Sequence, residues 1–174
     1  MNTQNFDFVA RSKAPWKLVA ENLFHSSEVL WKECLQAWEQ MNKLSKTETK
    51  QPIPLHMYPG TNVWPTSQML AGLALENLLK CIIIRRDPTL VKEGSINRTL
   101  ITHNLLELFK RVEIQLTSGE NDLISKLEIM VKWGGKYPLP QEATNNHVRA
   151  TDGKYFETFE ALYKKTLTTL EGSP

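Results

Sequence analysis

Arg98 and His103 have the types and spacing that suit the cleavage of RNA, in the order Arg98-Thr-Leu-Ile-Thr-His103. A histidine, whose ordinary pKa is about 6.5, can take the proton of a 2′-hydroxyl group, and an arginine can stabilise the negative charge that develops on the phosphate. A histidine that follows Thr102 at the start of a helix can equally be a capping or packing residue. The sequence therefore predicts either a catalytic pair or a local structural role.

Glu76 and Lys80 are charged residues inside an otherwise apolar segment. They are four residues apart, which places them on the same face of a helix. Because an isolated buried charge is costly, each of them must be paired or must face a cleft. We expect a mutual ion pair, within the chain or across a dimer, or a place for both residues in the binding of a substrate.

Lys136 and Tyr137 follow two glycines and place a basic group beside an aromatic ring. Such a pair can bind a phosphate or stack on a base. The alternative is that Gly134-Gly135 ends a helix, after which Tyr137 and Pro138 form an extended segment that packs on the other helices. Both interpretations stay open at this point.

No metal-binding pattern is present, because the four histidines are far apart in the sequence: His25, His56, His103 and His147. The motifs His-Glu-x-x-His and Cys-x-x-Cys do not occur, and there is no glycine-rich phosphate-binding loop. Cys34 and Cys81 lie in apolar helical patterns, where a free thiol usually behaves as a small buried hydrophobic group. We therefore expect neither a metal nor a cofactor.

The composition is that of one globular domain over residues 1–174, with 41% hydrophobic and 23% charged residues. The 21 basic and 19 acidic residues give a net charge of +2, which does not demand a nucleic acid or an anionic membrane as partner. Residues 1–11 contain no apolar run of the secretory type. We expect residues 1–13 to be a flexible N-terminal segment and the protein to be cytoplasmic.

Two long helices must position these residues. The first is predicted from Pro15 to about Leu44, because apolar residues recur every three or four positions and a first helical turn tolerates proline. The second, from Met69 to Arg86 after a cap at Thr66 or Ser67, is apolar on nearly every face and is predicted to be the central helix. Its most apolar part is shorter than the roughly 20 residues that cross a bilayer, so we expect no membrane.

Three shorter helices are expected in the second half of the chain. The third helix follows Thr102 as its N-cap, and the fourth follows a capping box from Thr117 to Glu120 and ends at Gly134-Gly135. The fifth follows Thr151 or Asp152 and presents an apolar stripe of aromatic and aliphatic residues. Because no alternating strand pattern is found, the predicted fold class is all-α.

The first helix carries three of the five tryptophans, Trp16, Trp31 and Trp38. Trp31 lies off the main apolar stripe, so the apolar face of this helix is wide. Aromatic residues are enriched at interfaces, and the helix is longer than a compact domain needs for its own core. We therefore expect a homodimer.

Three blocks occur in order along the chain: Leu73-Ala-Leu-Glu-Asn-Leu-Leu-Lys80, Thr102-His-Asn-Leu-Leu-Glu-Leu108 and Trp133-Gly-Gly-Lys-Tyr-Pro138. Together they resemble the HEPN-like (higher eukaryotes and prokaryotes nucleotide-binding) helical proteins, over about residues 66–140. The resemblance implies an up-and-down bundle of four to five helices that often dimerises. It also implies a role as a nucleotidyltransferase partner, a toxin or defence ribonuclease, or a non-catalytic version of these.

Ribonucleases of this kind carry an arginine, four to six further residues and a histidine, usually on a late helix. Arg98 and His103 satisfy the spacing, but they fall at the start of the third helix, and Thr99 follows the arginine. We therefore expect a dimeric, non-catalytic binding or regulatory module that is associated with nucleic acid or nucleotide in a stress or defence context.

Two alternatives remain. One is a metal-independent endoribonuclease that uses Arg98 and His103, with Lys136 and Tyr137 as substrate contacts. The other is a small-molecule sensor with a pocket between its helices. A dry apolar pocket with few polar groups would favour the sensor, whereas a basic cleft at a dimer interface would favour RNA.

Overall fold

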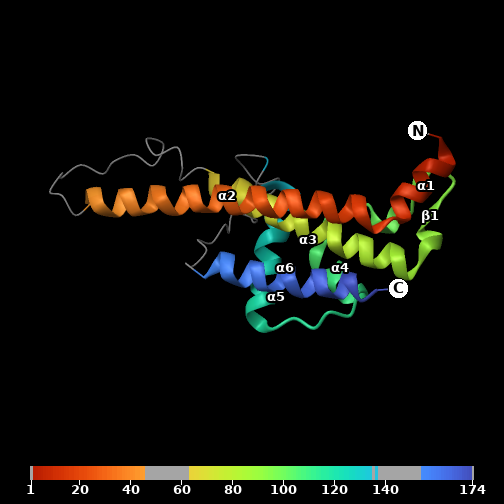
Figure 1. Ribbon diagram of the computed structural model, residues 1–174. Helices are drawn as coiled ribbons and strands as arrows, with labels where there is room; N and C mark the ends of the chain where they lie inside the picture. Colours follow the sequence, from red (N-terminus) through yellow and green to blue (C-terminus); the bar gives the residue numbers. More distant parts are fainter. Residues whose placement is uncertain (1, 46–62, 135, 137–153, 174) are drawn as a thin grey trace.

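The computed structural model describes residues 2–45, 63–134, 136 and 154–173. Most of these residues are helical, which confirms the all-α class (Figure 1). The described α-helices are α1 (Thr3–Arg11), α2 (Lys13–Ser45), α3 (Trp64–Arg86), α4 (Leu105–Arg111), α5 (Ser118–Ile129) and α6 (Tyr155–Glu171). Three shorter helical elements join them: the 3-10 helices η3 (Pro88–Leu90) and η4 (Arg98–Leu100) and the π-helix η5 (Met130–Gly134).

Residues 91–96 form a small β-hairpin, so the expectation of a chain without strands is wrong at this place. The strand β1 (Val91–Lys92) pairs antiparallel with β2 (Ser95–Ile96). Glu93 and Gly94 form the two-residue loop, and both have positive φ angles, of 54° and 76°. A tight hairpin turn of this kind requires such angles, because its twist then matches that of the two strands.

The long N-terminal helix is confirmed by α2, which extends over 33 residues. A shorter helix, α1, precedes it within the segment to which the sequence analysis assigned no helix. Asn2 caps α1, because its side chain accepts a hydrogen bond of 2.8 Å from the backbone N–H of Asn5. Ser12 is extended (φ −76°, ψ 139°), so the chain changes direction between α1 and α2 (Figure 1).

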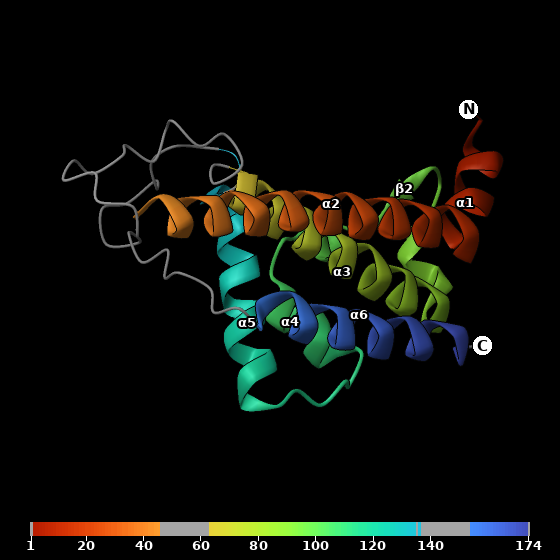
Figure 2. The same cartoon turned by 60° about the vertical axis from the view of Figure 1, so that its left-hand side comes forward.

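The central position predicted for the second helix is confirmed by α3, which contacts α1, α2, α4, α5 and α6. The helices α2, α3 and α6 lie side by side, whereas α5 crosses them (Figure 2). This crossing departs from a purely up-and-down arrangement. The two ends of the chain lie at the same end of the molecule (Figure 1), where Lys13 and Lys17 pair with Glu171 at 2.7 and 2.8 Å.

The most apolar part of the second helix was expected to be too short to cross a bilayer, and the length of α3 corrects this expectation. With 23 residues, α3 is long and apolar enough to cross a membrane by length and composition alone. However, 72% of its most apolar window is buried inside the structure, as in the core helix of a folded domain. Packing against the neighbouring helices therefore accounts for the apolar character of α3.

Two predicted helix starts also need correction. The N-cap of α3 is Val63, and Pro65 lies in the first turn, where its missing N–H costs nothing. The N-cap of α6 is Lys154, and the predicted caps Thr151 and Asp152 lie outside the described residues. By contrast, the capping box of α5 is confirmed.

A pair of buried serines joins α2 to α3. The hydroxyl of Ser27 donates to the backbone carbonyl of Ser67, and the hydroxyl of Ser67 donates to the backbone carbonyl of Ser27, each at 2.9 Å. Both residues are fully buried. Ser67 therefore links two helices instead of capping one, and small side chains at this place let α2 and α3 approach closely.

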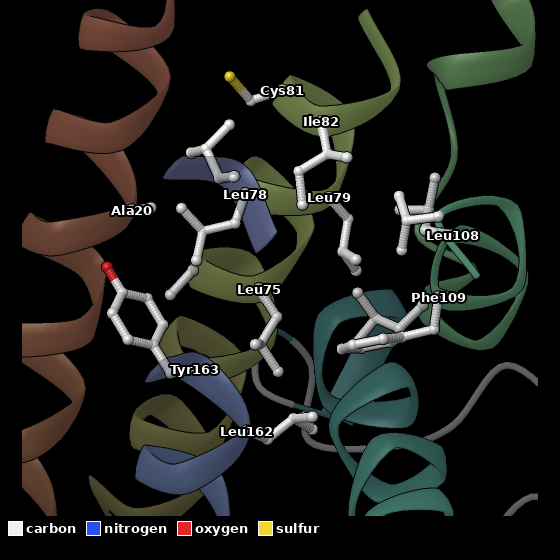
Figure 3. Close-up of a cluster of buried hydrophobic side chains, with 14 of the residues drawn as sticks. Ala20, Leu75, Leu78, Leu79, Cys81, Ile82, Leu108, Phe109, Leu162 and Tyr163 are labelled. Carbon is white, nitrogen blue, oxygen red and sulfur yellow. The ribbon is translucent and has the colours of Figure 1, made fainter. Parts of the chain in front are cut away.

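The core surrounds α3 on several sides. Figure 3 shows Leu78 and Leu79 of α3 between Ala20 and Tyr163 on one side and Phe109 on the other. Ala20, Leu78 and Leu79 are fully buried. This arrangement explains why the sequence of α3 has no polar face.

Trp31 is buried within the chain itself and does not face a partner. Only 4% of it is exposed, and its ring centroid lies 5.1 Å from that of Tyr155 and 6.4 Å from that of Phe156 on α6. It also meets Trp38 edge to face at 5.6 Å. The part of the apolar face of α2 that Trp31 forms is therefore covered by α6. Trp31 does not support a homodimer, which stays a prediction.

Candidate functional site

Glu76, Lys80 and His103 form one polar cluster at the middle of α3. Lys80 Nζ lies 2.7 Å from Glu76 Oε1, and His103 Nδ1 lies 2.9 Å from Glu76 Oε2. The exposed fractions of the three side chains are 6% for Glu76, 14% for Lys80 and 47% for His103. The structure therefore brings His103 to the pair of Glu76 and Lys80, which the sequence analysis had treated separately from it.

The ion pair of Glu76 and Lys80 follows directly from their spacing. Residues four apart in an α-helix lie on one face, and glutamate before lysine is the favourable order. The carboxylate of Glu76 is buried, but each of its oxygens has a partner. The sequence expectation of a pair within the chain is thus confirmed, and the cost of burying a charge is offset by two charge-assisted contacts.

His103 is held by the segment between η4 and α4. Leu100 and Leu105 are buried on either side of it and fix the two ends of this segment. Asn104 is the N-cap of α4 and accepts a hydrogen bond from the backbone N–H of Glu107 at 3.1 Å. The predicted cap, Thr102, instead accepts from the backbone N–H of Asn104, so His103 lies just before the helix and not inside it.

The contact with Glu76 orients the His103 ring. A carboxylate next to Nδ1 favours the tautomer that carries its proton on Nδ1. The other ring nitrogen, Nε2, is then the one that can accept a proton. About half of the His103 side chain is exposed, so a molecule from solution can reach it. This arrangement resembles the carboxylate–histidine pairs that orient a general base, although it also serves to cover a buried carboxylate.

A cavity of about 450 Å³ lies against this cluster. Its described lining residues come from α1, α2, α3, the β-hairpin and η4 with the residue that follows it. They are Phe6, Trp16, Glu76, Asn77, Lys80, Gly94, Ser95, Ile96, Leu100 and Ile101. Most of the lining is apolar, and the ion pair of Glu76 with Lys80 supplies its only charged side chains among these residues.

A second cavity of about 320 Å³ adjoins the first, because Phe6, Trp16, Asn77 and Ile96 line both. Its other described lining residues are all apolar: Val9, Ala10, Pro15 and Val19. Both cavities are within the range of small-molecule sites. We call these two neighbouring cavities the two-chamber pocket, with the 320 Å³ cavity as the apolar chamber and the 450 Å³ cavity as the polar chamber.

The walls of the two-chamber pocket are tied to each other across the chain. Asp7 on α1 accepts a hydrogen bond of 2.9 Å from the backbone N–H of Gly94 in the hairpin loop. Arg11 donates to the backbone carbonyl of Val91, and Trp16 Nε1 donates to the carbonyl of Ala10 at 2.8 Å. The hairpin and α1 are therefore fixed in place over the middle of α3.

The other predicted site residues are not joined to this cluster. Arg98 is exposed on η4, and the described residues include no hydrogen bond or ion pair between Arg98 and His103. Lys136 is exposed beyond η5 and is not among the described residues that line the two-chamber pocket. Tyr137 lies outside the described residues.

Cys34, Cys81 and His25 are not among the described residues that line the two-chamber pocket. Cys34 and Cys81 are buried, as predicted, and burial raises the pKa of each thiol to about 11. The side chain of His25 is 75% exposed and lies 3.7 Å from Glu28. In the described part of the chain no group of three His, Cys, Asp or Glu residues is arranged to hold a metal ion.

Sequence reasoning missed most of the pocket walls. Phe6, Val9 and Ala10 follow the i, i+3, i+4 spacing of a helix face, and this signal would have revealed α1. Asn77 was visible as a polar residue on the central helix, but nothing local shows that it faces a cavity. Ile96 comes from a hairpin of two-residue strands, which is too short to give an alternating pattern.

No protein-family model, no curated protein and no solved structure matches this chain. The resemblance to HEPN-like proteins therefore stays a prediction. The site must be interpreted from its own geometry.

Proposed function

We propose that this protein is a non-catalytic binding module that takes a small, largely apolar molecule into the two-chamber pocket. The observation that carries this proposal is the placement of the buried Glu76–Lys80 pair on the wall of a mostly apolar cavity. Binding sites for small molecules combine apolar and aromatic walls with a few placed polar groups. Phe6 and Trp16 provide the aromatic walls, and Asn77 adds a polar group to both chambers.

The charge of the site favours a small molecule over a nucleic acid. Binding to a nucleic acid rests on several cationic side chains that contact successive phosphates. Among the described lining residues Lys80 is the one cation, and a single cation cannot contact several successive phosphates. The association with nucleic acid or nucleotide that the resemblance to HEPN-like proteins suggests is therefore the less supported form of the binding proposal.

The test uses N-phenyl-1-naphthylamine, an uncharged apolar dye whose fluorescence rises when it leaves water. We expect saturable binding with one site per chain. Val19→Phe should weaken it, because Val19 lines the apolar chamber and is 45% exposed, so a larger side chain there does not disturb the core. The matched control is Val29→Phe on the same helix, since Val29 is 50% exposed and does not line the pocket.

The outcomes separate clearly. Weaker binding by Val19→Phe alone supports the proposal. No saturable binding by the wild type, or equal binding by all three proteins, contradicts it. Circular dichroism of each variant verifies that the helices are intact.

A metal-independent endoribonuclease is the second candidate. The observation that favours it is the half-exposed His103 whose ring is held by a buried carboxylate, with the exposed Arg98 five positions earlier. His103 would take the proton from the 2′-hydroxyl, and Arg98 would stabilise the charged phosphate. Lys136 and Tyr137 are the substrate contacts that the resemblance suggests for this candidate.

A further inference from the structure

We infer that the ligand of the two-chamber pocket is an amphiphile with a carboxylate head group, and that Lys80 binds this head group. The inference rests on the proposed binding function and adds the chemical class of the ligand. Two observations carry it. Both carboxylate oxygens of Glu76 have partners, whereas Lys80 contacts one acceptor among the described residues. In addition, one chamber is apolar, whereas the other contains the ion pair.

The two chambers differ in what they can accept. The apolar chamber is lined by Val9, Ala10, Pro15 and Val19 beside the shared residues. A charged or polar group placed there would lose water without gaining a partner, which is costly. The apolar body of a ligand therefore belongs in this chamber, and its head group belongs beside Glu76 and Lys80 in the polar chamber.

The carboxylate of Glu76 is not the group that binds the ligand. Its Oε1 atom accepts from Lys80, its Oε2 atom contacts His103, and only 6% of the side chain is exposed. A cationic head group would have to displace one of these partners. The site is therefore unfavourable for amines and quaternary ammonium groups.

Lys80 is in the opposite situation. Its ammonium group has three N–H donors, and among the described residues Glu76 is the one acceptor that it contacts. Lys80 lines the polar chamber, and 14% of its side chain is exposed. Two donors thus remain for a ligand, and charge-assisted hydrogen bonds to an anionic acceptor are about twice as strong as neutral ones.

Two neighbouring groups support an anionic head group. Asn77 lines both chambers, and its Nδ2 atom donates one hydrogen to the carbonyl of Leu73 at 2.8 Å, which leaves a second hydrogen on that nitrogen. His103 Nδ1 occupies Glu76 Oε2 at 2.9 Å, so the carboxylate of Glu76 is held by its own partners and Lys80 is the charged group left to meet an anionic head group. A planar carboxylate with two acceptor oxygens suits donors on two neighbouring turns of α3.

The experiment compares three ligands with the same ten-carbon chain: decanoate, 1-decanol and decyltrimethylammonium. Decanoate and decyltrimethylammonium are used below the concentrations at which they form micelles, and 1-decanol is used below its solubility limit. Each ligand is tested for displacement of N-phenyl-1-naphthylamine from the wild-type protein. We expect decanoate to bind about tenfold more tightly than 1-decanol, because only the carboxylate carries a negative charge that pairs with the ammonium group of Lys80. The cation should bind most weakly.

Lys80→Met removes the ammonium group and keeps an unbranched side chain that is only one atom shorter. We expect this variant to bind decanoate and 1-decanol equally. The matched control is Lys92→Met, since Lys92 is 77% exposed on β1 and does not line the pocket. If Lys80→Met does not fold because Glu76 loses a partner, Glu76→Gln combined with Lys80→Met removes both charges and serves instead.

The outcomes of this inference are distinct from those of the proposed function. Equal binding of decanoate and 1-decanol by the wild type, or tighter binding of the cation, overturns the inference but leaves the pocket as a binding site. A preference for decanoate that persists without Lys80 also overturns it. Failure of the dye itself to bind would overturn the proposed function.

Discussion

The Nδ1 atom of His103 lies 2.9 Å from the Oε2 atom of Glu76, although 27 positions separate the two residues. Glu76 is buried in the central helix, whereas His103 belongs to the connection that leads into α4 and is half exposed. The contact joins the interior of the fold to its surface. It also completes a cluster in which Lys80 is the cation that borders the polar chamber.

The ribonuclease candidate predicts cleavage that depends on His103 and Arg98, whereas the binding module predicts none. We expect the wild-type protein to leave mixed RNA intact in buffer without metal ions. A gel assay with wild type, His103→Ala, Arg98→Ala and the control His25→Ala decides this. Cleavage by the wild type and His25→Ala that is lost in the other two variants would establish the ribonuclease, provided that all four proteins are folded.

Removing the carboxylate of Glu76 should destabilise the fold. Glu76→Ala leaves the ammonium group of Lys80 largely buried beside a cavity, and breaking a buried ion pair costs about 3 kcal/mol at the lower end of the known range. The matched control is Glu160→Ala, because Glu160 and Lys164 have the same spacing on α6 but are 41% and 68% exposed. That change should cost about 0.5 kcal/mol or less.

Urea denaturation measures both free energies of unfolding. An equal loss of stability in Glu76→Ala and Glu160→Ala would show that burial does not make the pair of Glu76 and Lys80 more important for stability than an exposed pair.

Gly72 is required where α3 packs against the end of α5 and against η5. A Cβ atom at this position would clash with Val131 Cγ2 and would lie 3.3 Å from the carbonyl oxygen of Leu127. Gly72→Ala should therefore destabilise the protein by about 1–3 kcal/mol, the usual cost of overpacking a core. Gly119→Ala is the control, because no atom lies within 4 Å of its added Cβ, and it should stabilise α5 by about 0.5–1 kcal/mol.

The clash can be tested directly by thermal or urea unfolding of the double variant. Val131→Ala removes the γ-methyl groups of Val131, so Gly72→Ala combined with Val131→Ala should cost less than the sum of the single changes. Additive losses would argue against the clash.

The two cysteines should be unreactive in the folded protein. Burial raises the pKa of Cys34 and Cys81 to about 11, and the thiolate is the reactive form. At pH 8 we expect 5,5′-dithiobis(2-nitrobenzoate) to label almost no thiol in the native protein and two per chain in urea. Rapid labelling of either cysteine under native conditions would contradict its position in the core.

The C-terminal end of α6 should lose its attachment to α2 in acid. Hydrogen bonds from Lys13 and Lys17 lower the pKa of Glu171 from 4.5 to about 2. Because the pKa is depressed in the folded state, the stabilisation is present above pH 4.5 and is lost as the pH falls toward 2. The effect is small, because the pair is exposed to solvent.

Thermal unfolding of Glu171→Gln between pH 7 and pH 2 tests this. We expect the variant to melt below the wild type at pH 7 and to approach it near pH 2. Glu39→Gln, at an exposed position on α2, should match the wild type throughout. A gap between Glu171→Gln and wild type that is independent of pH would contradict the role of the carboxylate.

Much of the helical framework could be predicted from the sequence, because helices are defined by neighbours three or four residues apart. The long helix α2, the apolar central helix α3 and the capping box of α5 are patterns of this kind. The ion pair of Glu76 with Lys80 is equally local, since one turn of helix brings the two side chains together.

The contact of His103 with Glu76 and the two-chamber pocket were decided only by the tertiary structure. Both depend on how α1, the hairpin and η4 pack over α3, and no periodic pattern in the sequence encodes the distance between such segments. The burial of Trp31 under α6 is of the same kind: the sequence showed an apolar face, but only packing determined which surface covers it. Local spacing thus determined the helices and one ion pair, whereas side-chain packing between distant segments determined the site.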